Sequence, residues 1–299
     1  GKGYYRGSTV LVSGTAGTGK TSVAVHFIDA ACRRGERCLY FAFEESPSQI
    51  LRNMRSIGID LQAWVKEGLL KFRAARATLY GLEMQLEAMR EVVLEFEPRV
   101  IVVDPISNLV AVGAESDVKS MLTRLIDWLK TRGITSLFTD LTYHGGPQEA
   151  TEVRISSLMD TWILLKMLEE KGERNRALYI LKSRGMAHSN QIREFLITEK
   201  GIELLDVYLG PGGVLTGSAR YVQEAREKAE ALALRQEIER KERELERKRK
   251  AMEAQITTLK ARFEAEEEEL IKIIFCQKLP KHTWQLSETV KVVFFAKIV

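Results

Sequence analysis

A glycine-rich run near the start of the sequence carries its strongest chemical signal. The eight residues from Gly14 to Thr21 match the pattern G-x-x-x-x-G-K-[ST] at every fixed position. In such a loop the glycines let backbone N–H groups close around phosphate oxygens, and the following helix adds its positive dipole end. We expect Lys20 to reach the β- and γ-phosphates of ATP and the Thr21 hydroxyl to ligate Mg²⁺. The ATP-binding residues predicted from this run are Gly14, Thr15, Ala16, Gly17, Thr18, Gly19, Lys20, Thr21 and Ser22.

Carboxylates stand at the ends of two further apolar segments. Asp104 closes the apolar run 99–103, in the usual place for an aspartate that holds Mg²⁺ through water and positions it against Thr21. Glu44 and Glu45 follow the segment 37–43, and one of them can accept a proton from the group that attacks the γ-phosphate. Two adjacent carboxylates also disfavour full ionisation of both. The alternatives are that Asp104 caps the next turn and that both glutamates decorate the start of the next helix.

Strands and helices must alternate to position these side chains. A β-rich segment precedes the glycine-rich loop, and a helix ended by Gly35 follows it, which disfavours the alternative of a glycine-rich turn that binds nothing. The predicted strands are 8–13, 37–43, 69–72, 99–104 and 135–139, and the predicted helices are 22–34, 47–56, 81–96 and 116–131. Apolar strands that alternate with helices predict an α/β fold, with a mostly parallel sheet covered by helices on both faces.

The second half of the chain follows different patterns. From about Arg154 we expect hairpin-connected strands at 158–167, 176–183 and 191–198, an antiparallel extension that is common in RecA-like P-loop NTPases. We place the end of the first domain, 1–218, near Ser218. Residues 219–275 predict a coiled-coil helix, with apolar heptad positions interrupted at Glu242 and Arg249; the alternative is a lone, solvated helix. Residues 276–299 do not match the sequence that precedes them, and we leave them unassigned. One interpretation is that they are non-native sequence.

Composition excludes several classes of protein. The 299 residues include 45 basic and 41 acidic side chains, and this near balance argues against a dedicated nucleic-acid binder. Cys32, Cys38 and Cys276 have neither metal-ligand nor disulfide spacing, which is typical of a reducing cytoplasm. No apolar run reaches membrane-spanning length, and the start is no signal peptide. Because the chain opens at Gly1 almost directly on a strand, we expect a fragment of a longer protein.

Several motifs in the first 218 residues together carry a family resemblance. They are the runs 6–21, 41–46, 154–161, 182–185 and 192–195. In this order they resemble KaiC, the family of circadian-clock ATPases and autokinases, and specifically its second, C-terminal ATPase domain. Members carry two such domains in tandem, whereas this chain has one phosphate loop. The resemblance therefore implies a fragment or a single-domain relative.

The resemblance assigns roles to matching residues. It makes Glu44 the general base and an Mg²⁺-associated carboxylate, with Glu45 as its neighbour. Ser156 and Ser157 fall on the two autophosphorylated positions, although the second is usually threonine, so the order of phosphorylation stays open. Without the resemblance, these serines would be ordinary hydroxyls at the start of a strand. In the family, basic residues reach ATP from the adjacent subunit, and Arg176, Lys182 and Arg184 match them. With Ser183, which lies between Lys182 and Arg184, they are the ATP-binding residues that the resemblance implies. The alternative is that they form a solvated strand face.

The resemblance also implies what the protein does and with what. It implies an ATP-dependent serine autokinase and ATPase of a circadian or timing system, with Mg-ATP at the subunit interfaces of a homohexamer. A KaiB-like clock protein is an implied partner, and the heptads add the expectation that two rings stack into a dodecamer. The competing reading is a DNA-dependent ATPase of RecA, RadA or DnaB type. The candidate strand-binding loop 141–153 contains two glutamates and no lysine, which argues against nucleic acid as a partner.

Overall fold

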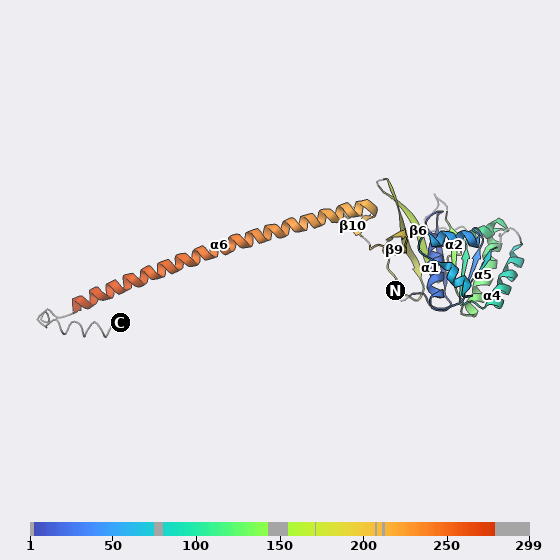
Figure 1. Ribbon diagram of the computed structural model, residues 1–299, viewed down its shortest axis with the longest axis horizontal. Coiled ribbons are helices and arrows are strands. Elements are labelled where there is room, and N and C mark those ends of the chain that lie inside the picture. Colours follow the sequence, from blue (N-terminus) through green and yellow to red (C-terminus); the bar gives the residue numbers. More distant parts are fainter. Residues whose placement is uncertain are drawn as a thin grey trace. The chain divides into compact units, whose positions relative to one another are not determined.

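The computed structural model describes residues 3–74, 80–142, 155–170, 172–206, 208–210 and 213–278. Its strands are β1 (Thr9–Gly14), β2 (Cys38–Ala42), β3 (Leu70–Ala74), β4 (Val100–Asp104), β5 (Thr135–Leu141), β6 (Thr161–Glu170), β7 (Glu173–Ser183), β8 (Arg193–Thr198), β9 (Gly201–Leu204), β10 (Tyr208–Gly210) and β11 (Gly213–Leu215). Within these ranges the main sheet has nine strands in the order β3-β2-β4-β5-β1-β6-β7-β8-β9 (Figure 1). Strands β10 and β11 pair separately. The strand that leads into the phosphate loop, β1, therefore lies in the middle of the sheet.

Helices cover both faces of this sheet. They are α1 (Lys20–Cys32), α2 (Pro47–Arg55), α3 (Leu61–Lys66), α4 (Leu82–Phe96), the 3-10 helix η2 (Ile106–Ala111), α5 (Glu115–Thr131) and α6 (Gly217–Lys278). Side chains alternate along β1, so Val10 and Val12 pack in one core with α1, α2 and α3, whereas Leu11 packs in the other with α4 and α5. Strands β1 to β6 run parallel to one another, and β7, β8 and β9 extend the sheet from β6 with antiparallel pairing. The predicted fold is confirmed.

The structure corrects the first strand of the predicted extension. β6 begins at Thr161 rather than at residue 158, because residues 155–158 form a turn closed by a hydrogen bond from the Leu158 N–H to the Ile155 carbonyl oxygen (2.9 Å). β6 also runs parallel to β1 before it pairs with β7, so it closes the parallel part of the sheet. Ser156 and Ser157 thus lie on a turn and do not open a strand.

Five short elements escaped the sequence patterns: helix α3, the 3-10 helix η2 and the strands β9, β10 and β11. Three parts of the sequence analysis also reach beyond the described residues. Helix α3 is capped by the Asp60 carboxylate, which accepts from the Gln62 N–H, but its six residues are too few for a clear helical period. The 3-10 helix η2 is as short. The proposed strand-binding loop from Tyr143 onward, Arg154 of the family motif, and the tail from 279 fall outside the described ranges.

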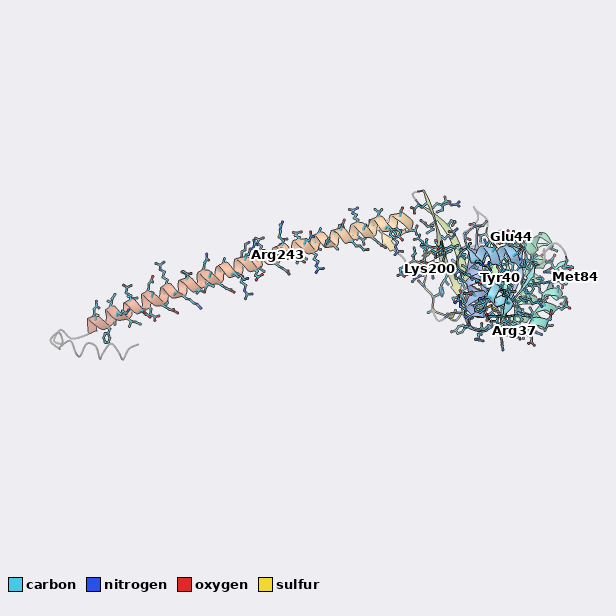
Figure 2. All side chains as sticks on the ribbon, viewed as in Figure 1. Arg37, Tyr40, Glu44, Met84, Lys200 and Arg243 are labelled. Carbon is cyan, nitrogen blue, oxygen red and sulfur yellow. The ribbon has the colours of Figure 1, made fainter. Side chains whose placement is uncertain are left out.

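The chain divides into two compact units, residues 1–223 and 224–299, and each is described by itself. Helix α6 runs without a break over 62 residues, of which residues 224–278 belong to the second unit. Its heptad residues from Ile238 to Leu270 are between 46% and 69% exposed, so nothing in the described part of the chain covers them. Figure 2 shows the side chains of α6, Arg243 among them, standing all round the helix, and many form ion pairs one turn apart.

Candidate functional site

The phosphate loop lies between β1 and α1 at the carboxyl edge of the parallel strands. Gly17 and Gly19 adopt positive φ angles of 79° and 98°, which other residues rarely take. A Cβ on Gly14 would stand 2.6 Å from the carbonyl oxygen of Leu165 on β6, so this position admits only glycine. No side chain caps the amino end of α1, and no acidic residue lies in its first turn. The exposed N–H groups and helix dipole therefore favour an anion at this place.

Lys20 is the cation of this loop. Its buried ammonium donates hydrogen bonds to the carbonyl oxygens of Gly14 and Thr15, both at 2.9 Å. Burial lowers the pKa of Lys20, and the negative charges of Asp104, Glu44 and Asp140 oppose that shift. The fold thus brings together Lys20, Asp104 and Glu44, which the sequence assigned to one site. In this structure the ammonium is held by the loop's own carbonyl groups.

Asp104 is buried at the end of β4, and hydroxyl groups fix both of its carboxylate oxygens. The Tyr40 hydroxyl donates to Oδ2 at 2.5 Å, and the Thr139 hydroxyl donates to Oδ1. Burial and the Asp104 charge raise the pKa of Tyr40 well above its ordinary value, so Tyr40 stays a donor. Asp104 is therefore held in place beside Lys20, and its carboxylate oxygens bond Tyr40 and Thr139 rather than the turn at Pro105.

Thr21 and Asp104 fit an Mg²⁺ ion held largely by other ligands. Among the described residues, no cluster of three or more His, Cys, Asp or Glu side chains could hold a metal ion. Mg²⁺ needs no such cage, because it keeps several waters and binds one or two carboxylates together with substrate phosphates. Each oxygen of Asp104 retains a lone pair for a water after accepting one hydroxyl. The residues present therefore suit a magnesium–nucleotide complex.

Glu44 and Glu45 follow β2 and differ in their surroundings. Glu44 is exposed, whereas Glu45 is half-buried and accepts a hydrogen bond from Asn53 at 3.2 Å. Burial, then the charges of Asp104 and Glu44, raise the pKa of Glu45. The amino end of α2 is capped by Ser46 and Gln49, which bond each other's backbone N–H groups, so neither glutamate serves as the cap. Because Glu44 is the more exposed of the two carboxylates, it is the one open to a substrate.

Three residues of this site were missed by the sequence analysis. Tyr40 and Thr139 hold Asp104, and Asp140 is fully buried near the end of β5. Asp140 lies one residue before the end of β5, and its place directly after the predicted strand 135–139 is a signal that could have found it. Tyr40 and Thr139 read as ordinary strand residues, because only the pairing of β2, β4 and β5 brings them to Asp104.

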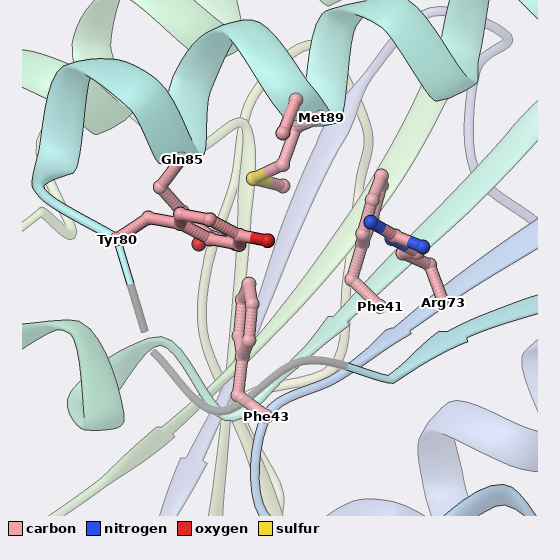
Figure 3. A pocket seen from close by; sticks show the side chains of 7 residues that line it. Phe41, Phe43, Arg73, Tyr80, Gln85 and Met89 are labelled. Carbon is pink, nitrogen blue, oxygen red and sulfur yellow. The ribbon is translucent and has the colours of Figure 1, made fainter. Parts of the chain in front are cut away.

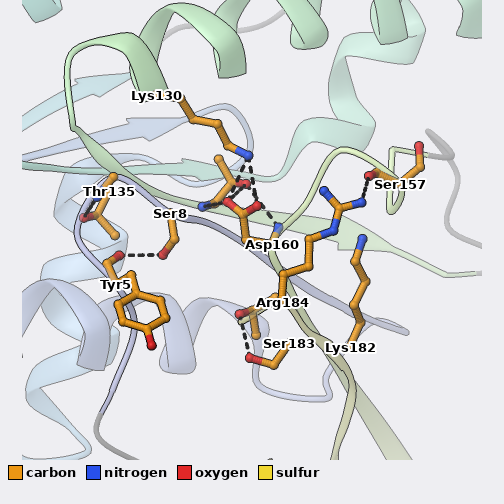
Figure 4. A network of polar contacts seen from close by, with 12 residues as sticks. Tyr5, Ser8, Lys130, Thr135, Ser157, Asp160, Lys182, Ser183 and Arg184 are labelled. Atoms are coloured by element: carbon orange, nitrogen blue, oxygen red, sulfur yellow. Dashed lines mark hydrogen bonds and ion pairs between the residues drawn. The ribbon is translucent and has the colours of Figure 1, made fainter. Parts of the chain in front are cut away.

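The candidate phosphoacceptors lie beside two of the predicted basic residues (Figure 4). Lys182 donates to the carbonyl oxygen of Ser156 and Arg184 to that of Ser157, both at 2.9 Å. Ser157 is exposed and Ser156 is half-buried. Ser183 shares a hydrogen bond with Thr161 at 3.3 Å. The two serines and two cations therefore form one cluster.

Arg176 lies apart from that cluster. Its guanidinium Nε donates to the carbonyl oxygen of Gly17 at 3.3 Å, so it contacts the phosphate loop of its own chain. The strand register explains this separation, because Arg176 pairs with Met167 near one end of β7 and Ser183 pairs with Thr161 at the other. Arg176 therefore lies at the phosphate loop, whereas Lys182 and Arg184 lie at the serine cluster.

The strand register also separates the serines from the phosphate loop. Asp160, three residues after Ser157, bonds Thr9 at the amino end of β1, whereas Gly14 at the carboxyl end begins the loop. At about 3.3 Å per residue, the five steps from Thr9 to Gly14 span about 17 Å. Within one chain the candidate acceptors thus lie at the amino end of β1, and the candidate ATP site lies at its carboxyl end.

A small cavity near the carboxyl edge is unsuited to a nucleotide. Among the described residues it is lined by Phe41, Phe43, Arg73, Tyr80, Gln85, Ala88 and Met89 (Figure 3). Its volume of about 10 Å³ has room for one water molecule. Gln85 Oε1 is buried there without a hydrogen-bond partner among the described residues, and such a water would satisfy it. The phosphate loop therefore remains the candidate nucleotide site.

Comparison with known proteins identifies the family of this chain. A sequence model of the family described as "ATPase: KaiC" matches residues 1–207. The circadian clock protein KaiC2 of Synechocystis sp. is 50% identical over 95% of this chain and 50% of its own length. KaiC3 of the same organism is 36% identical over 75% of this chain and 45% of its own. The circadian clock oscillator protein KaiC of Parathermosynechococcus lividus is 37% identical over 73% of this chain and 40% of its own.

These matches differ in their extent. The chain spans half or less of the length of these curated relatives. A match over 95% of the chain takes in most of α6 and some of residues 276–299, so the long helix is part of the likeness to KaiC2. No helix in the described ranges is long and apolar enough to cross a membrane. With a family match over more than half of its length and a phosphate loop in the expected place, the chain belongs to the KaiC family of ATPases.

Proposed function

We propose that this protein is an Mg²⁺-dependent ATPase and serine autokinase, and that the γ-phosphate of ATP bound to one chain passes to Ser156 or Ser157 of a neighbouring chain. The observation that supports this proposal is the separation of acceptors and phosphate loop to opposite edges of one sheet, by about 17 Å of strand. A ring in which each subunit offers its serine cluster to the next subunit's loop would bring the two together.

The proposed roles follow from the chemistry of each side chain. Backbone N–H groups of the loop and Lys20 bind the phosphates, and Thr21 and Asp104 hold Mg²⁺, which neutralises charge on the transferring phosphoryl group. Glu44 accepts the proton of the attacking serine hydroxyl or water. Glu45, whose pKa is raised and which accepts a hydrogen bond from Asn53, would assist Glu44 in this role as its direct neighbour.

Lys182 and Arg184 would act on the neighbour's nucleotide. Positive groups near the γ-phosphate offset the charge that develops in the transition state, as an arginine finger does. Because both already bond the acceptor carbonyl groups, they would arrive at that nucleotide together with the serines. Arg176, which contacts Gly17, would act on the phosphate loop of its own chain.

A mixing experiment tests transfer between chains. Glu44→Gln should bind ATP but transfer phosphate about 10²–10⁴-fold more slowly, because the amide cannot accept a proton. Ser156→Ala/Ser157→Ala keeps the base and lacks the acceptors. Co-assembled with Mg·ATP, the Glu44→Gln chains should gain phosphate, measured by intact mass, at a rate that neither variant reaches alone.

Two outcomes contradict this proposal separately. If the doubly substituted chains gained phosphate, the acceptor would be a residue other than Ser156 and Ser157. Wild-type chains that gain phosphate, together with mixed rings that gain none, would place transfer within one chain.

The same proposal extends to partners. The curated relatives are named as circadian clock proteins, and we propose that this chain serves a timing system in the cytoplasm, assembles as a homohexamer, and works with a KaiB-like clock protein. Pairing of α6 between two rings would give a dodecamer. Free thiols at Cys32, Cys38 and Cys276 suit a reducing compartment.

A further inference from the structure

Asp160 follows the turn 155–158 that carries Ser156 and Ser157, here called the acceptor turn, and it contacts Thr9, Lys130 and Arg184 (Figure 4). One oxygen of its carboxylate accepts from the Thr9 N–H and the Thr9 hydroxyl, both at 2.9 Å. The Lys130 ammonium lies 3.0 Å from the other oxygen and 2.9 Å from this one. The carboxylate therefore ties the turn to β1 and to the last turn of α5.

The main chain of Asp160 adds two further connections. Its N–H donates to the Thr9 carbonyl oxygen at 3.0 Å, and its own carbonyl oxygen accepts from the Arg184 N–H at 2.8 Å. The first bond fixes the end of the acceptor turn. The second fixes the end of β7, from which Lys182 and Arg184 reach back to Ser156 and Ser157. One residue thus holds both halves of the serine cluster.

The charge on this carboxylate is maintained by its partners. Burial favours the neutral acid, but hydrogen bonds from Thr9 and the hydrogen bond and charge of Lys130 outweigh burial and lower the pKa of Asp160. Lys130 stands in the last turn of α5, where a cation also interacts favourably with the helix dipole. A charge-assisted bond at a partly buried place is stronger than one between neutral groups.

We propose that Asp160, paired with Lys130, is a positioning residue for phosphotransfer: it fixes the Ser156–Ser157 turn relative to Lys182 and Arg184. This inference rests on the proposed autokinase function. The hydrogen bonds and ion pair of Asp160 described above are made with Thr9, Lys130 and Arg184 and not with the acceptor hydroxyl groups. Its effect would come through the geometry of the turn, where a misplacement of about 1 Å can cost about 10²-fold in rate.

The experiment compares four variants of the full chain with wild type. Asp160→Asn and Lys130→Met remove the ion pair from either side, and Lys130→Arg keeps it. Asp127→Asn removes an exposed carboxylate of the same helix α5 and serves as the control. Amide hydrogen exchange of residues 155–160 and 184 reports the turn itself, and phosphate incorporation with varied Mg·ATP reports kcat and KM separately.

Asp160→Asn and Lys130→Met should exchange these amides about tenfold faster and lower the kcat for phosphotransfer about 10-fold or more, with KM for ATP unchanged. Lys130→Arg and Asp127→Asn should behave as wild type. Unchanged exchange in both ion-pair variants, or unchanged kcat despite faster exchange, would overturn the inference. If Asp160→Asn fails to fold, Lys130→Met against Lys130→Arg decides. A wild type that gains no phosphate refutes the proposed function, and the exchange measurement still tests whether Asp160 holds the turn.

Discussion

At the scale of single residues, Lys20 shows how the site balances charge. Burial alone would favour the neutral amine, but Asp104, Glu44 and Asp140 surround it with negative charge that favours the ammonium. Two carbonyl oxygens complete its contacts. The same arrangement makes nucleotide binding depend on Lys20. Without its positive charge, a polyanionic nucleotide would meet only repulsion from the three carboxylates.

Lys20→Ala should therefore weaken Mg·ATP binding by about 100-fold or more, since bonds to charged groups contribute about 1.5–3 kcal/mol each. Because we expect ATP at the subunit interfaces, the substitution should also prevent assembly of the ring. Calorimetric titration and light scattering measure the two effects. Lys66→Ala, an exposed lysine of α3, is the control for loss of one charge. A stable hexamer of Lys20→Ala would show that ATP does not assemble the ring.

At the scale of elements, β1 links the two functional regions. It begins at Thr9, which Asp160 holds, and it ends at Gly14, where the phosphate loop starts. Near its loop end, the Trp162 indole donates to the Ser13 hydroxyl at 2.7 Å in a buried place. In addition to the pairing of the two strands, these side-chain contacts connect β1 with β6 and with Asp160 just before it. The position of the loop therefore depends on how closely β1 and β6 approach each other.

Gly14→Ala tests that close approach. Its Cβ would lie 2.6 Å from the Leu165 carbonyl oxygen, which is backbone of a central strand and cannot move alone. We expect a loss of about 1–3 kcal/mol in unfolding free energy and weaker ATP binding. Ala16→Ser, at an exposed position of the same loop, should stay within about 0.5 kcal/mol of wild type. Urea denaturation measures both, and equal stability of Gly14→Ala would contradict the tight β1–β6 contact.

At the scale of the whole molecule, the exposed apolar positions of α6 call for a partner helix. In a parallel, in-register pair, the polar core positions Glu242, Arg249 and Glu266 would each face their own copy, and like charges in a core are unfavourable. An antiparallel pair centred between Thr257 and Thr258 places Arg249 opposite Glu266. The core pairs of that arrangement are Leu245 with Leu270, Met252 with Phe263, and Ile256 with Leu259.

We therefore expect α6 helices to pair antiparallel, which requires chains from two rings because helices of one ring point the same way. Arg249→Glu should reduce a dodecamer to hexamers in sedimentation with ATP, and Arg249→Glu/Glu266→Arg should restore it. Truncation after Ser218 is the control for complete loss. Failure of the double exchange to restore the larger particle would contradict antiparallel pairing, since a parallel pair keeps like charges together in both variants.

The sequence by itself determined what local patterns encode. The phosphate loop, its flanking strand and helix, the carboxylates that end β2 and β4, and the heptads of α6 all follow from residue types at fixed short spacing. Such features depend on backbone conformation and on periodicity within one element, so they can be read without knowledge of the fold. The family resemblance then supplied roles for residues whose own types were ambiguous, such as Ser156 and Lys182.

Only the tertiary structure decided which distant residues meet. Asp160 contacts Thr9 across 151 residues of sequence, and Tyr40 and Thr139 meet at Asp104 because β2, β4 and β5 are neighbours in the sheet. The same strand order puts Arg176 at its own phosphate loop and Lys182 and Arg184 at the opposite edge. Strand order and register arise from packing of whole elements, so no local pattern encodes them.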